Sequence, residues 1–159
     1  MFTTEQHVDN LVRHIDLVRE ACLLLGKRLI AENRKEFGVI LISRGFVHDA
    51  SKFFGIEWDY LHAGKDVPRE KMELAVEQHI STNTHHPEYW GGIENMPEIC
   101  VAEMVCDWYA RSMEFGSSLR DWITETAISK YDIDVNGQQF EWINNFVDTL
   151  LQDNFVRWS

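Results

Sequence analysis

The N-terminal segment of the chain carries apolar residues at steps of three and four positions, which is the spacing of one helix face. Thr3 is followed three residues later by Gln6, a pair that forms a capping box at helix starts. Together these features predict a helix from about Thr4 to Ala31. The apolar positions of this face are Val8, Leu11, Val12, Ile15, Val18, Cys22, Leu25 and Leu29.

The rest of the chain repeats helical spacing in shorter segments, separated by glycine, proline and turn sequences. The run from Phe37 to Val47 is rich in Val and Ile but lacks the alternation of a strand, so a buried helix is expected. No internal repeat, strand pair or domain boundary is recognisable. The sequence predicts one domain over residues 1–159, a compact all-α bundle of about six helices. The remaining expected elements are a short helix and loop over Phe53–Lys65, a helix that starts with Asp66 and Pro68 and stops before HHPEYWGG, a helix from Pro97 to Gly116, a helix from Ser118 to about Tyr131, and a last helix carrying Phe140 to Leu151.

Charge and composition exclude several classes of partner. Fifteen basic against 26 acidic residues give a net charge of -11 and a pI near 5.0, the wrong sign for binding a nucleic-acid polymer or an anionic membrane. No apolar run reaches the roughly 18 residues of a membrane span, and the N-terminus lacks a signal-peptide pattern. The three cysteines include no C-x-x-C pair. We therefore expect a cytoplasmic protein.

Histidines and acidic residues in apolar surroundings are the features that composition leaves unexplained. His14 borders the apolar face of the first helix, and His48 and Asp49 directly follow the second. Asp107 lies in ICVAEMVCDWYA, whose only other charge, Glu103, shares its helix face. Two carboxylates in such a setting need a cation or an arginine to neutralise them. Histidine nitrogen combined with carboxylate oxygen suits Mn, Fe, Co, Ni or Zn.

The ordered set His14, His48-Asp49 and Asp107 in an all-helical chain resembles the HD-domain superfamily of metal-dependent phosphohydrolases. The resemblance implies that these four residues hold one divalent metal ion. The segments HD-x-S-K, HHPEYW and MVCDW also resemble a branch of that superfamily found in phages and bacteria, for which no substrate is implied. The expected location is then a bacterial cytoplasm, or the host cytoplasm for a phage protein.

The resemblance extends to a second ion. His79, His85 and His86 lie between the HD pair and the final aspartate, where two-metal HD proteins supply further ligands. Those proteins include cyclic-dinucleotide phosphodiesterases and di-iron oxygenases. In a two-metal site Asp49 would be the bridging ligand. Lys52 matches the lysine of HD-x-x-K in several two-metal members, whereas the G-Y-P signature of the cyclic-dinucleotide enzymes is absent from this sequence.

The first hypothesis is a metal-dependent phosphohydrolase that acts on a small phosphorylated metabolite, a nucleotide being favoured, with one or two divalent transition metal ions. Asp49 and Lys52 are the expected catalytic residues, and Lys52 and Arg44 the expected phosphate ligands. Two alternatives stay open, namely a di-iron oxygenase and a non-catalytic module that binds metal or nucleotide. Assembly into homo-oligomers also stays open. The aromatic residues Tyr89, Trp90, Trp108 and Tyr109 are interpreted as core packing.

Overall fold

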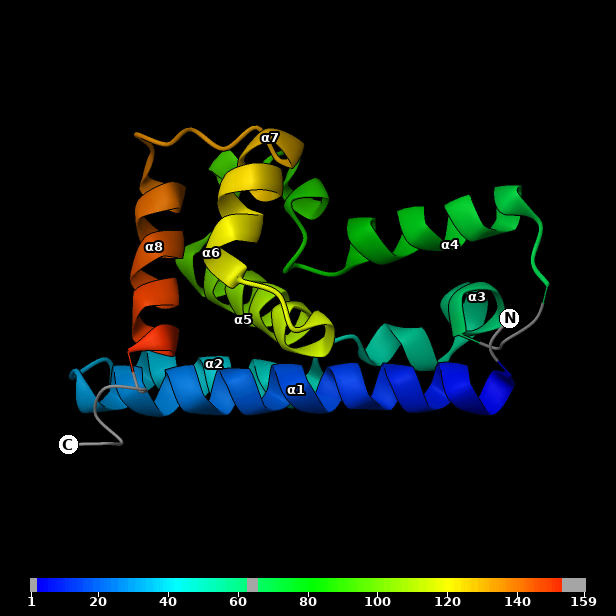
Figure 1. Ribbon diagram of the computed structural model, residues 1–159, viewed down its shortest axis with the longest axis horizontal. Helices are drawn as coiled ribbons and strands as arrows, with labels where there is room; N and C mark the ends of the chain where they lie inside the picture. The colour runs from blue at the N-terminus through cyan, green and yellow to red at the C-terminus, as the bar shows by residue number, and fades with distance from the viewer. Residues whose placement is uncertain (1–2, 63–65, 153–159) are drawn as a thin grey trace.

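The computed structural model describes residues 3–62 and 66–152, and within these ranges it is all-α, without a strand (Figure 1). The all-α prediction is therefore confirmed. The main helices are α1 (Thr4–Ala31), α2 (Lys35–Val47), α4 (Arg69–Thr82), α5 (Glu98–Phe115) and α8 (Gln138–Leu151). Short helical elements join them, namely η1 (Ala50–Phe53), α3 (Gly55–Glu57), η2 (Trp58–His62), η3 (Pro87–Trp90), η4 (Ile93–Asn95), α6 (Leu119–Trp122), η5 (Ile123–Ala127) and α7 (Ile128–Lys130).

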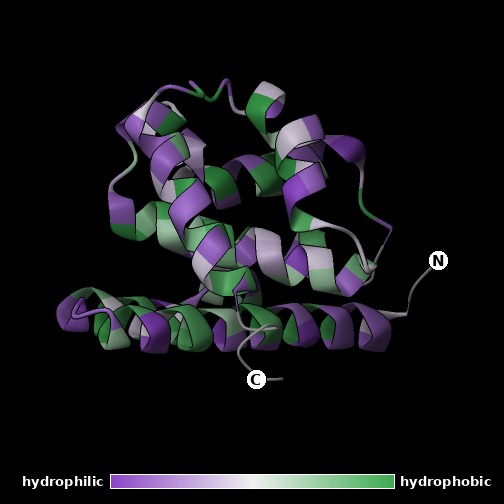
Figure 2. Cartoon of the chain, turned by 60° about the vertical axis from the view of Figure 1, so that its left-hand side comes forward, coloured by the Kyte–Doolittle hydropathy of each residue, from purple (hydrophilic) through white to green (hydrophobic). Residues whose placement is uncertain are grey.

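Helix α1 has the predicted bounds, and the predicted capping box is present. The backbone N–H of Gln6 donates to Thr3 Oγ1 at 3.2 Å, and the N–H of Thr3 donates to the Gln6 side chain at 2.8 Å. In Figure 2 polar and apolar residues alternate along α1, the long helix at the bottom of the view. The apolar face turns toward the core, where Val18 and Leu25 are fully buried, and His14 lies on the same buried face.

Helices α1 and α2 approach each other closely because glycines lie at their contact. A Cβ atom on Gly38 would collide with the backbone carbonyl of Gly26, and one on Gly45 would lie 2.6 Å from the Cβ of Cys22. Neither glycine has room for a side chain, so any substitution must separate the helices. This packing brings the C-terminal end of α2 beside α1, and the ring centroids of His14 and His48 lie 6.0 Å apart.

Helix α5 forms the centre of the core and packs against α1, α2 and α8. Val101, Val105 and Cys106 have no exposed surface. The helix ends as predicted at Gly116, whose φ of 62° is the left-handed conformation that glycine adopts without strain. Because α5 packs against α1 and α2, Asp107 lies close to His14 of α1 and to His48 at the end of α2.

Helix α4 differs from the expectation in its start, and little of it is buried. It begins at Arg69, with Pro68 as the flanking N-cap residue, so Asp66 and Pro68 lie outside the helix that they were expected to open. Its buried residues are Ala75 and His79, whereas Leu74 exposes 53% of its surface. In the preceding segment, three short elements from η1 to η2 replace the single expected short helix, and residues 63–65 lie outside the described part of the chain.

The expected helix after Ser118 is present as three consecutive elements, α6, η5 and α7, with a π-helical stretch between two α-helical ends. The Ser118 hydroxyl accepts a hydrogen bond from the backbone N–H of Asp121. This segment brings Trp122 and Tyr131 against Trp108, with ring centroids 5.0 Å and 5.7 Å away. Among the described helices, none has the length and the apolar character needed to cross a membrane.

The aromatic residues interpreted as core packing take different positions. Trp108 is buried in the core, and Trp90 and Tyr109 pack against it while partly buried. Tyr89 is 44% exposed. The interpretation is confirmed for the first three residues and wrong for Tyr89, which lies on the outer side of the short η3 helix.

Candidate metal centre

Asp49 is the central residue of a buried cluster of histidines and carboxylates. It is 2% exposed and lies in the turn between α2 and η1, where its φ of 55° is left-handed. That conformation costs a non-glycine residue about 1 kcal/mol or more, and Asn33 and Asp132 adopt it outside the cluster. The turn directs the two carboxylate oxygens of Asp49 toward two different groups of histidines.

The first ligand set consists of His14 on α1, His48 at the end of α2, and Asp107 on α5. His48 Nε2 lies 3.5 Å from Asp49 Oδ2, and His14 Nε2 lies 3.9 Å from the same oxygen. Asp107 closes the group, with Oδ1 3.0 Å from His14 Nε2 and Oδ2 3.8 Å from His48 Nε2. The four residues that the sequence predicts for one ion therefore lie together around the Oδ2 side of Asp49.

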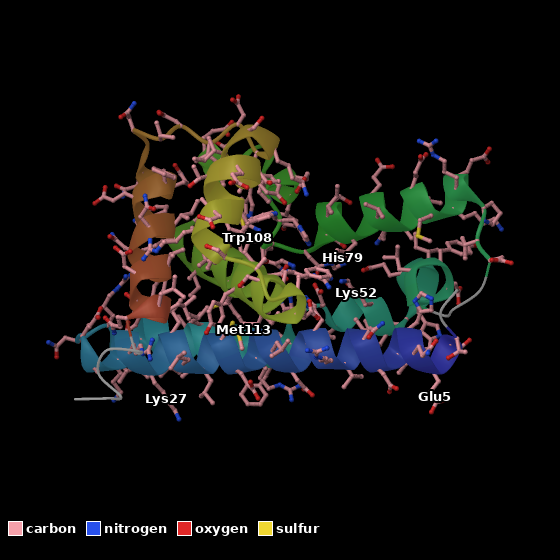
Figure 3. All side chains as sticks on the ribbon, viewed as in Figure 1. Glu5, Lys27, Lys52, His79, Trp108 and Met113 are labelled. Carbon is pink, nitrogen blue, oxygen red and sulfur yellow. The ribbon has the colours of Figure 1, made fainter. Side chains whose placement is uncertain are left out.

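The second ligand set consists of His79 on α4 and of His85 and His86 in the loop that follows α4. His79 Nε2 and His85 Nε2 lie 3.3 Å and 3.2 Å from Asp49 Oδ1. The ring centroid of His86 is 4.8 Å from that of His79 and 4.3 Å from that of His85. Asp49 and these three histidines each offer a ligand atom to one common point. Figure 3 shows His79 and Lys52 in the same region between α4 and α5.

Several buried atoms of the two sets have no hydrogen-bond partner in correct geometry. They are Nε2 of His14, His48, His85 and His86, together with Oδ1 of Asp49. A buried polar atom without a partner costs about 1–3 kcal/mol, and buried polar groups are rarely left this way. Imidazole nitrogens and carboxylate oxygens directed at common points fit a divalent transition metal ion. The residues in this cluster therefore have the chemistry to bind such an ion.

Carboxylates outside the two sets hold the other ring nitrogens. His14 Nδ1 contacts Glu114 Oε2 at 3.2 Å, His48 Nδ1 contacts Glu103 Oε1 at 2.9 Å, and His79 Nδ1 contacts Glu57 Oε1 at 2.5 Å. An ionised carboxylate only accepts hydrogen bonds, so each Nδ1 carries the donated proton and each Nε2 lone pair is left for a ligand. A carboxylate behind the histidine is the usual support of metal-binding imidazoles.

Glu103 supports both sets at once and is neutralised by an arginine. Its Oε1 contacts His48 Nδ1 and lies 3.3 Å from His85 Nδ1, and its Oε2 accepts a hydrogen bond from Arg44 Nε at 2.6 Å. Burial raises the pKa of Glu103, but the hydrogen bonds from His48 and His85 outweigh burial and hold the pKa far below its usual range. The repulsion expected between Glu103 and Asp107 is therefore offset, because each carboxylate has its own partners: His48, His85 and Arg44 for Glu103, and His14 for Asp107.

The charges of the ligands depend strongly on one another. Burial raises the pKa of Asp49, but His48, His79, His85 and Lys52 together lower it well below its usual range. Asp107 is also ionised, because the neighbouring histidine rings of the first ligand set lower its pKa more than burial raises it. Both carboxylates are therefore available to a cation at neutral pH.

The two histidines of the loop have opposite shifts. Burial lowers the pKa of His85, but the carboxylates of Asp49, Glu103 and Asp107 raise it to about 10. Burial and the neighbouring rings of His85 and His79 lower the pKa of His86 to about 3. In the metal-free protein at neutral pH, His85 is therefore charged and His86 is neutral.

A cavity of about 220 Å³ opens onto both ligand sets. Lys52 reaches into it, is 8% exposed, and its Nζ lies 2.8 Å from Asp49 Oδ2. Arg44 does not line this cavity, because its guanidinium is bound to Glu103 and to Thr84 Oγ1 at 2.6 Å. The full lining is His14, Asp49, Lys52, His79, His85, His86, Pro87, Met104, Asp107, Trp108, Arg111, Trp122, Lys130 and Tyr131.

The structure thus brings together every residue that the sequence predicts as a metal ligand and places Lys52 beside them. The supporting roles of Glu57, Glu103 and Glu114 were not predicted from the sequence. Two cations that line the cavity, Arg111 and Lys130, were not predicted either. Glu103 had a detectable signal, since an acidic residue in an apolar helical run needs a partner, but the sequence did not show that the partners are His48, His85 and Arg44.

Residues 3–149 match the family described as "Family of unknown function (DUF5662)", and the chain belongs to this family. No curated protein and no solved structure matches the chain. Function is therefore argued from the site.

Proposed function

We propose that this member of the DUF5662 family is a metal-dependent phosphohydrolase that acts on a small phosphorylated metabolite, a nucleotide being favoured. The observation that carries the proposal is the group of buried, unpartnered ligand atoms around Asp49, which lies on the wall of a cavity lined by cations. An ion site of this kind supports hydrolysis when it faces a space that a substrate can enter, because a purely structural metal site is closed.

The ligands divide between two ions. His14, His48, Asp49 and Asp107 would hold the first, and Asp49, His79, His85 and His86 would hold the second, with Asp49 shared. When bound, divalent ions make water a stronger nucleophile near neutral pH and offset the negative charge of phosphoryl oxygens.

The side chains around the ligands favour an anionic substrate. The protein as a whole has a net charge of -11, yet the cavity wall carries three cations, Lys52, Arg111 and Lys130, and two carboxylates, Asp49 and Asp107. Since the two carboxylates are also metal ligands, the cations remain available to a phosphate. A small anion is attracted locally, although a polyanion is repelled by the rest of the surface.

Lys52 has the best position for binding a phosphoryl oxygen. Its Nζ contacts Asp49 Oδ2, so the ammonium group is held next to the ligands instead of moving freely in solvent. An ammonium group has three donors, and one contact to Asp49 leaves others for a phosphoryl oxygen in the cavity. Lys52 would therefore hold the substrate against the ion site and stabilise charge that develops on the phosphoryl group.

The test begins with elemental analysis of protein purified without chelator. The protein is then loaded with Mn, Co, Ni or Fe and incubated with nucleotides, phosphomonoesters and cyclic nucleotides, with and without oxygen. Release of phosphate or of a phosphomonoester without oxygen is the expected result. Oxygen consumption without hydrolysis would overturn the proposal in favour of an oxygenase, and bound metal with neither activity would indicate a binding module.

A matched pair of lysine variants tests the role of Lys52. Lys52→Met should lower kcat about 100-fold and leave the metal content unchanged, because it removes a donor to the phosphoryl group and not a metal ligand. Lys27→Met, at an exposed position of α1, is the control and should keep full activity. Equal activities of the two variants would show that Lys52 does not act on the substrate.

A further inference from the structure

A second cavity adjoins the metal cavity and has a different chemical character. It measures about 200 Å³ and is lined by Trp108, Arg111, Ser112, Phe115, Ser117 and Trp122. Trp108, Arg111 and Trp122 also line the metal cavity, so the two spaces meet at these three side chains. The metal cavity holds the ligands and most of the charge, whereas aromatic rings form the walls of the second cavity. We call this second space the aromatic pocket.

Phe115 is the unusual residue of the aromatic pocket. It lies at the C-terminal end of α5 and exposes 77% of its surface, the largest exposed fraction among the large hydrophobic residues that the structure describes. A phenyl ring in this state contributes little to the stability of the fold, since it buries little area. Beside two tryptophans, however, it completes a surface on which a flat apolar group can be buried.

Arg111 connects the aromatic pocket to the metal site. Its Nη1 donates to Glu114 Oε2 at 3.0 Å, and the same oxygen contacts Nδ1 of His14 at 3.2 Å. This contact holds the guanidinium of Arg111, whose side chain is 49% exposed, at the border between the two cavities. Its remaining donors suit a phosphate oxygen, because an arginine has five N–H groups in a rigid plane.

The aromatic pocket offers few groups for reading a specific base edge. The hydroxyl of Ser112 donates to the backbone oxygen of Tyr109 at 2.7 Å, so its proton is already used within α5. The remaining contacts come from aromatic rings, namely those of Trp108, Trp122 and Phe115. Such rings recognise a ligand by its flat shape and by stacking, and any flat aromatic group can stack. Discrimination between different aromatic groups should therefore be weak.

We propose that the substrate is a phosphomonoester carrying a planar aromatic group, with its phosphate between Lys52 and Arg111 and its aromatic group in the aromatic pocket. This inference rests on the proposed phosphohydrolase function and specifies its substrate class. In the reaction, oxygen from water forms a new bond to phosphorus while the bond from phosphorus to the ester oxygen breaks. The alcohol that carries the aromatic group leaves with a proton, and inorganic phosphate is the second product.

The test compares two esters that differ in the aromatic group. Manganese-loaded protein is assayed with adenosine 5′-monophosphate and with ribose 5-phosphate, which share the sugar and the phosphate. The expected kcat/KM is at least about tenfold higher for the nucleotide, mainly through KM, because the base buries apolar area that the sugar phosphate lacks. Guanosine and cytidine 5′-monophosphates should have values within about fivefold of the adenosine ester, since stacking tolerates any flat base.

Two variants separate the parts of the site. Phe115→Ala should lower kcat/KM for the nucleotide about tenfold and leave ribose 5-phosphate within about twofold, because the phenyl ring contacts only the aromatic group. Arg111→Met should lower both values alike, since both esters carry the phosphate. Phe46→Ala is the matched control, because Phe46 is also exposed, at 58%, but lies on α2 away from both cavities.

Binding measurements separate this inference from the proposed function. If neither ester is hydrolysed, calorimetry of the manganese-loaded protein still reports whether the nucleotide binds more tightly than ribose 5-phosphate and whether Phe115→Ala removes the difference. That result would support the aromatic pocket and overturn hydrolysis. Equal binding and equal turnover of the two esters, unchanged by Phe115→Ala, would overturn the role of the aromatic pocket and leave the phosphohydrolase proposal intact. Failure of both esters to bind would also overturn the role of the aromatic pocket.

Discussion

The two sides of Asp49 are built from parts of the molecule that differ in burial. The first ligand set lies on α1, α2 and α5, which form the core. The second lies on α4 and its following loop, and α4 buries only Ala75 and His79 while Leu74 and Val76 are exposed. Figure 1 shows α4 extending away from α5, α6 and α8.

This difference indicates that the two ligand sets are prepared for metal to different degrees. Segments with few buried apolar contacts open at lower free-energy cost than core helices. The first set is therefore held in place by the core, whereas the second set depends more on polar contacts, such as that of His85 Nδ1 with Glu103 Oε1 at 3.3 Å, and on any ion that it binds. We expect the first ion to bind more tightly and the second to leave first under a chelator.

Asp49→Asn tests the shared residue and has the largest expected effect. An amide loses the negative charge and one acceptor oxygen that both ligand sets require, so the metal content should fall from two ions toward none, and hydrolysis by at least about 1,000-fold. The measurements are elemental analysis and phosphate release.

Asp121→Asn, at an exposed position of α6, is the matched control and should keep its metal and activity. Unchanged metal content in Asp49→Asn would show that Asp49 is not a ligand and would remove the basis for comparing its two sides.

The first ligand set could be predicted from the sequence because its residues stand out locally. His14 interrupts an apolar helix face, and Asp107 is a charge within an apolar run. His48 and Asp49 lie between these two residues in the chain, which completes the residue order of the HD-domain superfamily. The start of α1 and the end of α5 were equally accessible, since Thr3 and Gln6 fix the first and Gly116 fixes the second.

The supporting residues could not be predicted because their partners are distant in the chain. Glu103 lies 55 residues from His48, and Glu114 lies 100 residues from His14. Periodicity places Glu103 on a helix face but does not show which histidine the fold brings to it. The same limit affected Arg44, expected at a phosphate but engaged by Glu103. Helical spacing alone also does not reveal whether a helix face packs against another element, as the exposed Leu74 of α4 shows.

Removing two histidines of the second ligand set should separate the two sides. In His79→Ala/His86→Ala the metal content should fall from about two ions to one, because Asp49 and the first set remain. We expect kcat to fall far more than KM rises, because the second ion would stabilise charge in the transition state while Lys52 still binds the ground state. Metal analysis and steady-state kinetics measure both effects.

The matched double variant for the first side is His14→Ala/Asp107→Ala. If the core holds the first ligand set in place, this variant should lose the first ion and also weaken the second, since Asp49 then lacks its neighbours. If the wild type and His79→Ala/His86→Ala hold the same single ion and turn over equally, those histidines are structural and the site holds one ion.

A smaller effect is expected from Glu57→Gln, which leaves every ligand in place. Glu57 holds Nδ1 of His79, and a neutral amide in its place supports the ring less well and no longer fixes the tautomer. Loss of such a support weakens metal binding about 10- to 100-fold, here for the second ion only. Competition with a chromophoric chelator measures the two affinities, and Glu77→Gln, at an exposed position of α4, the helix that carries His79, is the control. An equal loss for both ions would contradict the assignment of Glu57 to one side.

The smallest expected effect is the release of one proton when metal binds to the second ligand set. In the metal-free protein the carboxylates of Asp49 and Glu103 hold the pKa of His85 near 10 against the opposing effect of burial, so His85 is protonated at pH 8. A cation at the second ligand set needs the neutral ring, so loading both ions at pH 8 should release about one proton more from the wild type than from His85→Asn. His86, whose pKa is about 3, should add none. Calorimetry in two buffers of different ionisation enthalpy counts the protons.

The same pKa gives the metal-free protein a dependence of stability on pH with a definite sign. His85 has a higher pKa in the folded chain, about 10, than its ordinary value of 6.5, so the folded state holds the proton more tightly. The resulting stabilisation is complete below about pH 6.5 and is lost as the pH rises to about 10. Chelated wild type should therefore lose more thermal stability between pH 6 and pH 10 than chelated His85→Asn, in which no proton is bound at this position. Equal losses would mean that His85 is neutral without metal, and the second ligand set would then be as ready for an ion as the first.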